Sequence, residues 1–399
     1  MVDENPAGAM PRPSGPSLLY VATVSHTLRH FLIPYAAHFR ALGWRVDAAA
    51  SGSSVDPALH DAFDHVYEIP LSRSIRDVNG LVRTGQALSR ILESGPDIVH
   101  VHTPIAAFVT RLSARRVRAD VRPRVAYTAH GFHFHRGGRR ATNAAFLTAE
   151  RVAGRWTSRL VVINDEDYEA AQRNRIVAPS RLVRMPGIGI DTQVFSRSGM
   201  SAEDFAVARR HVDVGSDTPL FVVVGELNRN KRHEDVIAAL GRMRHREAQL
   251  VVLGSGREQP RLEALASHEG LRDRIRFAGY VEDIRPLVAS AIALVLCSKR
   301  EGLARSIMEA LALEVPVVAS TARGNRELVG ADGGFVVPTG DVRALAESMD
   351  WLVEHPIERL EMGHRGRARM VERYDLQILI RLHEEMYRDM LEARGRRSH

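Results

Sequence analysis

Cysteine and lysine are scarce in this chain of 399 residues. The single cysteine, Cys297, excludes an internal disulfide framework and fits a reducing compartment. It ends an apolar run, so we interpret it as a core residue rather than a nucleophile. Of the 55 basic residues only Lys231 and Lys299 are lysines, an arginine-rich composition that is typical of a GC-rich genome. Each lysine is a candidate for a specific role.

Long apolar runs are absent too. No stretch reaches the roughly 20 apolar residues that span a bilayer. Residues 1–16 lack the apolar core of a signal peptide and are rich in proline, glycine and polar groups, so we expect a disordered tail there. We therefore expect a cytoplasmic protein, with peripheral attachment to the inner face of the plasma membrane as its only route to a bilayer.

The net charge of +7 and pI of about 9.9 predict an anionic partner. We expect no nucleic acid, because no helix-turn-helix, zinc-finger or RNA-binding signature is found. A phosphorylated substrate or an anionic membrane surface explains the charge as well. The basic run 111–124, which follows apolar residues 105–109, is the candidate membrane surface, and a solvated helix face is the alternative.

Apolar strand-like runs alternate with helical patterns along the whole chain, which predicts an α/β fold of two Rossmann-like, doubly wound domains. The strands that we expect are 17–24, 45–50, 65–69, 98–102, 124–129 and 159–163 in the first half, and 219–224, 249–253, 274–278, 292–297, 315–319 and 334–337 in the second. A Gly- and Pro-containing segment, residues 185–195, separates the halves. We predict an N-terminal domain over 17–190, a C-terminal domain over 191–375, and a last helical segment, 376–399, that packs back across the domain interface.

The run from Ser298 to Val315 carries two glutamates, Glu301 and Glu309, eight residues apart. It predicts a polar loop after a buried strand and then a helix that starts near Ala304. Unpaired N–H groups at a helix start attract phosphate, and nearby carboxylates accept bonds from sugar hydroxyls. This combination suits a nucleotide sugar, but on spacing alone we favour the interpretation of two surface glutamates on a solvated helix.

Three further loops follow strands in the same half. Gly225 begins a basic loop that contains Lys231, whose compact ammonium group suits a diphosphate. Gly254-Ser-Gly256 places backbone N–H groups near an anion or only makes a tight turn. Gly279-Tyr280 forms a wall for a base or an ordinary loop.

Histidines gather in the first half, at His100, His102, His130, His133 and His135. Zinc is disfavoured, because a His-Glu-x-x-His helix and partner cysteines are both missing. His130 follows a strand end and precedes a glycine, so it is either a sugar or phosphate contact or a structural loop histidine.

Taken in order, these motifs resemble the family 4 glycosyltransferases, whose two-domain fold is called GT-B, over roughly residues 17–395. The N-terminal half looks like members that build exopolysaccharide or O-antigen repeat units. The resemblance implies a retaining transfer from a nucleotide-diphosphate sugar, without a metal or other cofactor. It also implies that residues 17–190 form the acceptor-binding domain and residues 191–375 the nucleotide-sugar-binding domain. It implies that His130 and Glu301 contact the transferred sugar, that Lys231 neutralises the diphosphate and that Glu309 binds the ribose. The other donor-binding residues that it implies are Gly225, Arg229, Gly254, Gly256, Tyr280, Val281, Gly302, Leu303, Ala304, Arg305 and Ser306.

Two positions depart from the family pattern. Glu226 stands where many members have an arginine, which Arg229 or Arg232 would have to replace. Residues 24–30 replace the family's Gly-Gly turn, so the acceptor chemistry stays open. We expect a UDP-sugar donor, for example a UDP-N-acetylhexosamine, and a saccharide or polyprenyl-linked acceptor.

Two other functions stay open at this point. A UDP-sugar epimerase of the same two-domain design would need no acceptor. A non-catalytic nucleotide-sugar-binding protein would bind the donor and turn nothing over.

Overall fold

The computed structural model describes residues 15–71, 77–135 and 137–395, with side chains up to residue 393. Apart from Gly15 and Pro16, the predicted N-terminal tail lies outside the described residues. The chain divides into two compact units. Unit 1 comprises the chain up to Val162, Tyr168–Arg184 and the segment from Leu382, and unit 2 comprises Ile163–Asp167 and Met185–Arg381.

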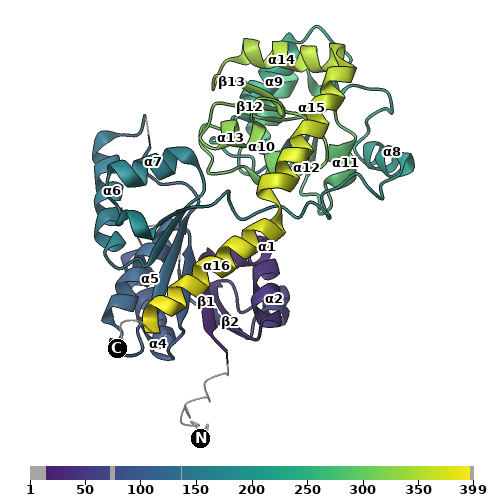
Figure 1. Ribbon diagram of the computed structural model, residues 1–399. Coiled ribbons are helices and arrows are strands. Elements are labelled where there is room, and N and C mark those ends of the chain that lie inside the picture. The colour runs from purple at the N-terminus through teal and green to yellow at the C-terminus, as the bar shows by residue number, and fades with distance from the viewer. Residues whose placement is uncertain (1–14, 72–76, 136, 396–399) are drawn as a thin grey trace, which may run out of the picture. The chain divides into compact units, whose positions relative to one another are not determined.

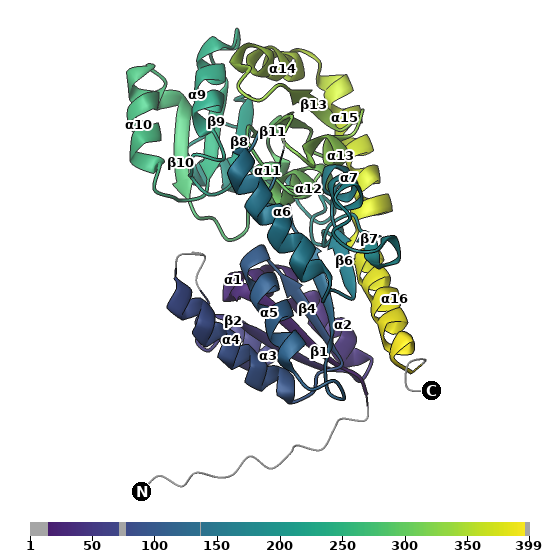
Figure 2. The ribbon, with the colours of Figure 1, turned by 90° about the vertical axis from the view of Figure 1, so that its left-hand side faces the viewer.

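Unit 1 contains a seven-stranded parallel sheet in the order β3-β2-β1-β4-β5-β6-β7. Figure 2 shows α4 and α5 side by side along this unit. Its elements are β1 (Ser17–Val24), α1 (Ser25–Phe31), α2 (Ile33–Ala41), β2 (Arg45–Ser51), α3 (Pro57–Ala62), β3 (His65–Glu68), α4 (Val78–Glu93), β4 (Ile98–His102), α5 (Pro104–Arg116), β5 (Arg124–Ala129), α6 (Arg140–Gly154), β6 (Arg159–Val162), α7 (Asp165–Arg173, whose first three residues belong to unit 2) and β7 (Leu182–Arg184).

Unit 2 contains a six-stranded parallel sheet in the order β10-β9-β8-β11-β12-β13. Figure 1 shows α13 and α14 beside β12 and β13 of this sheet. Its elements are α8 (Ala202–His211), β8 (Leu220–Val224), α9 (His233–Arg242), β9 (Gln249–Leu253), α10 (Gln259–His268), β10 (Ile275–Gly279), α11 (Arg285–Ala289), β11 (Ala293–Leu296), α12 (Arg305–Ala312), β12 (Val317–Ser320), α13 (Asn325–Val329), β13 (Gly334–Val337), α14 (Val342–Glu354) and α15 (Pro356–Arg369). The last helix, α16 (Leu376–Gly395), begins in unit 2 and continues into unit 1 at Leu382.

The sequence explains this architecture. Strands such as β8 (Leu-Phe-Val-Val-Val) are apolar throughout, because a parallel sheet is covered by helices on both faces. In unit 2 two separate groups of buried side chains, one around Leu220 and Ile307 and the other around Phe221 and Leu240, make up the core. The predicted α/β class with two doubly wound sheets is confirmed. The predicted domain limits and the packing of residues 376–399 stay predictions.

Each sheet reverses its strand order once, between β1 and β4 in unit 1 and between β8 and β11 in unit 2. Open α/β sheets bind ligands beyond the carboxyl ends of the strands at such a reversal. The loops that follow these four strands are therefore where a site is expected. Within the described part of the chain, no helix is long and apolar enough to cross a membrane.

Candidate active site

The loop after β8 positions Lys231. A Cβ atom on Gly225, which follows the strand, would lie 3.3 Å from Lys231 Cε, so glycine leaves space for the lysine stem. The Asn228 side chain accepts the backbone N–H groups of Asn230 (3.0 Å) and Lys231 (3.2 Å). This Asn-centred turn, which the sequence analysis did not single out, folds the loop before α9 begins. The sequence signal for this turn is the pair of asparagines, Asn228 and Asn230, that follows an apolar strand and Gly225.

The loop between β11 and α12 positions Glu301 and ends at Ala304, the N-cap of α12. No side chain caps this helix, and among the N–H groups of its first turn that of Ile307 donates to the Ala304 carbonyl over 3.1 Å. They carry the positive end of the helix dipole, which favours an anion. Gly302, Leu303, Arg305 and Ser306, the other donor residues predicted from this run, lie in the same loop and first turn.

The two loops are tied to each other. Lys299 N–H donates to the Asn230 carbonyl (2.8 Å), and Asn230 Nδ2 donates to the Arg300 carbonyl (2.9 Å). Between them, Lys231 Nζ donates to Glu301 Oε1 over 2.8 Å. The side chains of Lys231 and Glu301 are 19% and 14% exposed. The structure thus brings together two predicted residues that are 70 positions apart, at the strand reversal of unit 2.

Glu309 lies on α12, one turn after Arg305, and is 8% exposed. Burial raises the pKa of its carboxyl group, and the Arg305 guanidinium, whose Nε donates to Glu309 Oε1 over 2.8 Å, opposes that rise. A carboxylate kept in a buried position at some electrostatic cost is typical of a functional site. Its role towards a ribose stays a prediction.

Gly254 and Gly256 have a packing explanation. A Cβ atom on Gly254 would lie 2.1 Å from the Gly225 carbonyl oxygen, and one on Gly256 would lie 2.4 Å from that of Leu227. Glycine is therefore needed for the loops after β8 and β9 to approach each other, whatever they bind. A donor contact by either glycine stays a prediction.

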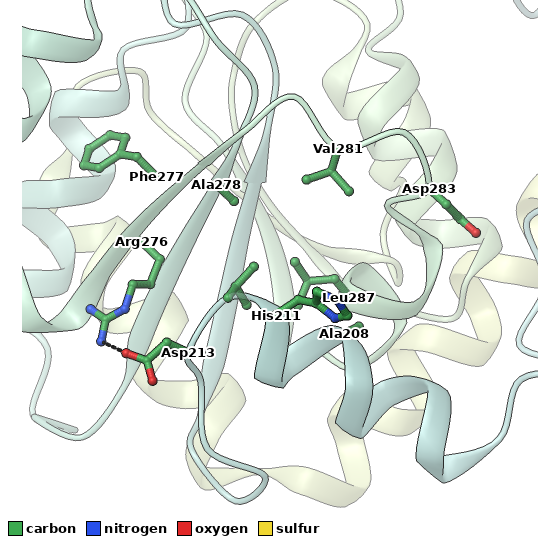
Figure 3. Close-up of a pocket in the computed structure, with 10 residues that line it drawn as sticks. Ala208, His211, Asp213, Arg276, Phe277, Ala278, Val281, Asp283 and Leu287 are labelled. Atoms are coloured by element: carbon green, nitrogen blue, oxygen red, sulfur yellow. Dashed lines mark hydrogen bonds and ion pairs between the residues drawn. The ribbon is translucent and has the colours of Figure 1, made fainter.

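Tyr280 and Val281 follow β10. Tyr280 is 70% exposed, while Val281 is half-buried and lines a cavity of about 560 Å³ beside α8. Figure 3 shows the Arg276–Asp213 ion pair at one side of this cavity and Val281 at the other. These contacts do not test the prediction that the loop after β10 forms a wall for the nucleotide base.

Glu226 stands where many family members have an arginine. The two arginines proposed to replace it, Arg229 and Arg232, have different surroundings. Arg232 donates two hydrogen bonds to Asp235, through Nε (2.5 Å) and Nη2 (2.6 Å), so its guanidinium is already engaged. The Arg229 side chain is 76% exposed, and its Nε lies 3.4 Å from Glu258 Oε1. Arg229 is consequently the more available cation of the two.

In unit 1 the predicted His130 belongs to a cluster. His130 Nε2 lies 3.0 Å from His102 Nδ1, and His100 Nε2 lies 2.7 Å from Thr128 Oγ1. Tyr387, from α16, hydrogen-bonds to His100 Nδ1 through its hydroxyl group. Burial lowers the pKa of all three histidines, that of His130 to about 4, with a smaller contribution from His383. His130 is therefore neutral at physiological pH and suits hydrogen bonding rather than cationic contact.

The histidine cluster predicts acid sensitivity. An unfolded histidine titrates near pH 6.5, whereas His130 in the fold titrates near 4, so protons bind preferentially to the unfolded chain between these values. The contribution of these histidines to the free energy of unfolding should be constant above about pH 7 and should fall as the pH drops from about 6.5 to 4. Urea unfolding across this range measures the slope. His102→Gln should make the slope shallower without removing it, because the pKa values of His100, His130 and His233 are lowered too. His268→Gln, at an exposed position on unit 2, should leave the slope unchanged.

The basic run 111–124 does not form the continuous membrane surface that we predicted. Arg111 is 1% exposed, donates to Glu150 over 3.0 Å and stacks on the Tyr127 ring. Val109 is buried in the core of unit 1. The prediction failed here because the partners of Arg111 are distant in the sequence. Arg115, Arg116, Arg118 and Arg122 remain exposed.

Cys297 is 3% exposed, and burial raises the pKa of its thiol, so its assignment to the core is confirmed. Among the residues that the structure describes, no group of three or more His, Cys, Asp or Glu side chains could hold a metal ion.

Comparison with known proteins identifies the family. The model for group 1 glycosyl transferases matches residues 204–369, and that for glycosyltransferase family 4 matches residues 31–194. The putative glycosyltransferase EpsD of Bacillus subtilis is 32% identical over 355 residues, which cover 88% of this chain and 91% of EpsD. An Escherichia coli enzyme, UDP-Gal:alpha-D-GlcNAc-diphosphoundecaprenol alpha-1,3-galactosyltransferase, is 22% identical over 79% of this chain and 81% of its own length.

Solved structures agree on the fold. A glycosyltransferase of Rickettsia africae superposes with a TM-score of 0.80 at 18% identity, over 95% of this chain and 99% of its own. Anabaena HepE, in complex with UDP and glucose, gives 0.78 at 18% identity, over 94% and 100%. The family matches support sugar transfer and not the epimerase alternative. The chain therefore belongs to the family 4 glycosyltransferases, and it is a glycosyltransferase.

Proposed function

We propose that this glycosyltransferase takes a sugar from a UDP-sugar and transfers it, with retention of the anomeric configuration, to a saccharide acceptor in polysaccharide biosynthesis. Two relatives support the substrates. HepE is described in complex with UDP and glucose, and the E. coli relative is named for a UDP-galactose donor and a diphosphoundecaprenol-linked acceptor. The acceptor that we propose here is accordingly a saccharide on a polyprenyl diphosphate.

The observation that carries the donor proposal is the Lys231–Glu301 pair beside the uncapped start of α12. In the proposed complex Lys231 and the first-turn N–H groups of α12 bind the diphosphate, and both stabilise the negative charge that develops on the leaving group. Glu301, released from Lys231 or shared with it, accepts hydrogen bonds from hydroxyl groups of the transferred sugar. Glu309 accepts hydrogen bonds from the ribose, and His130 contacts the sugar as a neutral group.

A panel of donors tests this proposal. We expect UDP-sugars, for example UDP-N-acetylglucosamine, to raise the melting temperature, and GDP- and ADP-sugars to raise it less. A ligand at 100 times its dissociation constant stabilises a protein by about 2.7 kcal/mol. Incubation with the best donor and a polyprenyl-diphosphate-linked saccharide, followed by NMR of the new linkage, should show the anomeric configuration of the donor. An inverted product contradicts the mechanism, and a GDP-sugar preference contradicts the donor assignment.

Metal independence is a separate expectation. Lys231 and the start of α12 supply positive charge where some other transferases use a divalent ion, so turnover should survive EDTA at millimolar concentration. The initial rate with and without chelator is the measurement. Loss of activity that Mg²⁺ or Mn²⁺ restores would show that a metal ion takes part.

Peripheral contact with an anionic membrane surface completes the proposal. The exposed side chains of Arg115 and Arg116, at the end of α5, support it. Each basic residue near an anionic surface contributes roughly 1 kcal/mol.

A further inference from the structure

A cavity of about 530 Å³ in unit 1 is lined by six arginines. They are Arg115, Arg122, Arg124, Arg155, Arg159 and Arg181. A second cavity of about 730 Å³ shares Arg155 and Arg181 and adds three more arginines from α6 and from α7 and the turn after it. No aspartate or glutamate is among the described residues that line either cavity. The two together form what we call the arginine pocket.

The arginine pocket is separate from the candidate active site. Arg124 is the first residue of β5, Arg159 is the first of β6, and Arg181 immediately precedes β7. These three strands are neighbours, so their starts lie side by side at the amino edge of the sheet. His130 follows the carboxyl end of β5, and at about 3.3 Å per residue it lies roughly 20 Å along the sheet from Arg124.

Three arginines of the first cavity contact neutral groups, whereas Arg173 of the second cavity lies 3.8 Å from the Glu169 carboxylate. Arg122 donates Nε and Nη2 to the Val117 carbonyl (3.2 and 3.0 Å), and Arg159 donates Nη1 to the Ser158 carbonyl (3.1 Å). The Arg115 guanidinium lies 5.2 Å from the centre of the Trp156 ring. These are neutral partners. In the described part of the chain neither Arg155 nor Arg181 pairs with a carboxylate, in contrast to the buried Arg111–Glu150 pair nearby.

Helix ends alone do not explain the accumulation of charge. α5 ends at Arg116 and α6 at Gly154, and the carboxyl end of each helix carries about half a negative charge. Two such ends offset about one of the six positive charges. An arginine at a helix end is ordinary, but a concave space that is lined by arginines and by no described Asp or Glu has a positive potential.

We propose that the arginine pocket binds a phosphate-bearing anion, as a second anion site distinct from that of the sugar donor. Guanidinium groups are planar forks that bind phosphate oxygens in pairs, and a cavity of this volume accepts a small ligand. Because Arg155 and Arg181 face both cavities, a group with two linked phosphates fits the pocket better than a single one. The ligand chemistry has two sources, a soluble diphosphate compound or the phosphates of a lipid headgroup.

Inorganic diphosphate tests the proposal by calorimetric titration. The protein is used as Lys231→Ala, which weakens the proposed donor site, so that the titration reports the arginine pocket whether or not the donor proposal holds. We expect binding that weakens with salt. Adding Arg155→Gln and Arg181→Gln should lower the affinity at least about tenfold, because each removes charge-assisted hydrogen bonds. The matched control is Arg83→Gln with Arg90→Gln, two exposed arginines on α4.

Equal loss in the control pair, or none in the pocket pair, would overturn the proposal, as would a failure to bind diphosphate at low salt. Trp156 provides a second readout, since its emission should change with diphosphate and the change should vanish in the pocket variant. Co-sedimentation with phosphatidylglycerol vesicles separates the sources. Vesicle binding that the pocket variant loses identifies a lipid headgroup, and diphosphate binding without vesicle binding identifies a soluble ligand.

Discussion

Lys231→Ala should lower the turnover number by on the order of 10²–10³-fold while the protein stays folded. Negative charge grows on the diphosphate as the sugar leaves, so the ammonium group of Lys231 stabilises the transition state more than the bound donor. The cost to folding should be small, about 1 kcal/mol, because the Lys231–Glu301 pair is partly exposed to water. Steady-state kinetics and a melting curve measured on the same preparation separate the two effects.

The sequence provides a matched control for this experiment. Lys299 is the only other lysine, is exposed, and lies two residues before Glu301. Lys299→Ala removes the same charge from the same loop pair and should leave the turnover number unchanged. Lys231→Arg should recover part of the activity, because a guanidinium fork has a different shape from an ammonium group. Full activity in Lys231→Ala would place the diphosphate elsewhere, with Arg229 as the first alternative.

Glu309→Gln should weaken UDP binding at least about tenfold and, at neutral pH, raise the stability of the unliganded protein. The lost carboxylate accepts bonds from ribose hydroxyls, each contributing roughly 1.5–3 kcal/mol. The pKa of Glu309 is raised in the fold, so ionising it at neutral pH destabilises the native state. Glutamine removes that charge and keeps the shape. Arg305 loses a partner, but its side chain is 38% exposed and can be solvated.

Calorimetry with UDP and thermal unfolding at pH 7.5 measure the two effects. Glu263→Gln, on the exposed face of α10, is the control and should change neither. The raised pKa of Glu309 also predicts a pH effect. Protonation of Glu309 should weaken UDP binding, and it should do so at a higher pH than the protonation of an ordinary glutamate would. Unchanged UDP affinity in folded Glu309→Gln would contradict the ribose assignment, and a large loss of stability would show that the carboxylate supports the fold.

Much of this fold follows from local pattern. Apolar runs bounded by Gly, Pro or polar residues predicted β1, β4, β5, β9 and β13 with the limits that the structure shows. β12 begins at Val317 and not at the expected Val315, because Val315 N–H still bonds to the Ala310 carbonyl at the end of α12 and Pro316 has no N–H to donate. β7, an edge strand of three residues, was not predicted, since so short a run carries no periodicity.

What local pattern could not supply is the identity of distant partners. Lys231 and Glu301 were each predicted from motifs, but only the fold shows that they pair. Arg111 lies in a basic run and appears solvated from the sequence, yet Glu150 and Tyr127 enclose it. The net charge of a sequence therefore predicts that an anionic partner exists more reliably than it predicts which arginine contacts that partner. The arginine pocket could not be predicted from the sequence, because the residues that line it come from five separate segments.

Because α16 belongs partly to unit 2 and partly to unit 1, unit 1 cannot finish folding until the end of the chain has been translated. All seven strands of unit 1 have been made by Arg184, but Tyr387, which is fully buried against His100 and Tyr20 in that unit, is synthesised about 200 residues later. At 5–20 residues per second this gap is about 10 to 40 seconds. For that time the nascent first unit exposes the surface that α16 will cover, which favours association with other chains while unit 2 is translated. A message cut short before codon 382 would yield a complete unit 2 joined to a unit 1 that lacks its last helical segment, so we expect aggregation rather than a weaker enzyme.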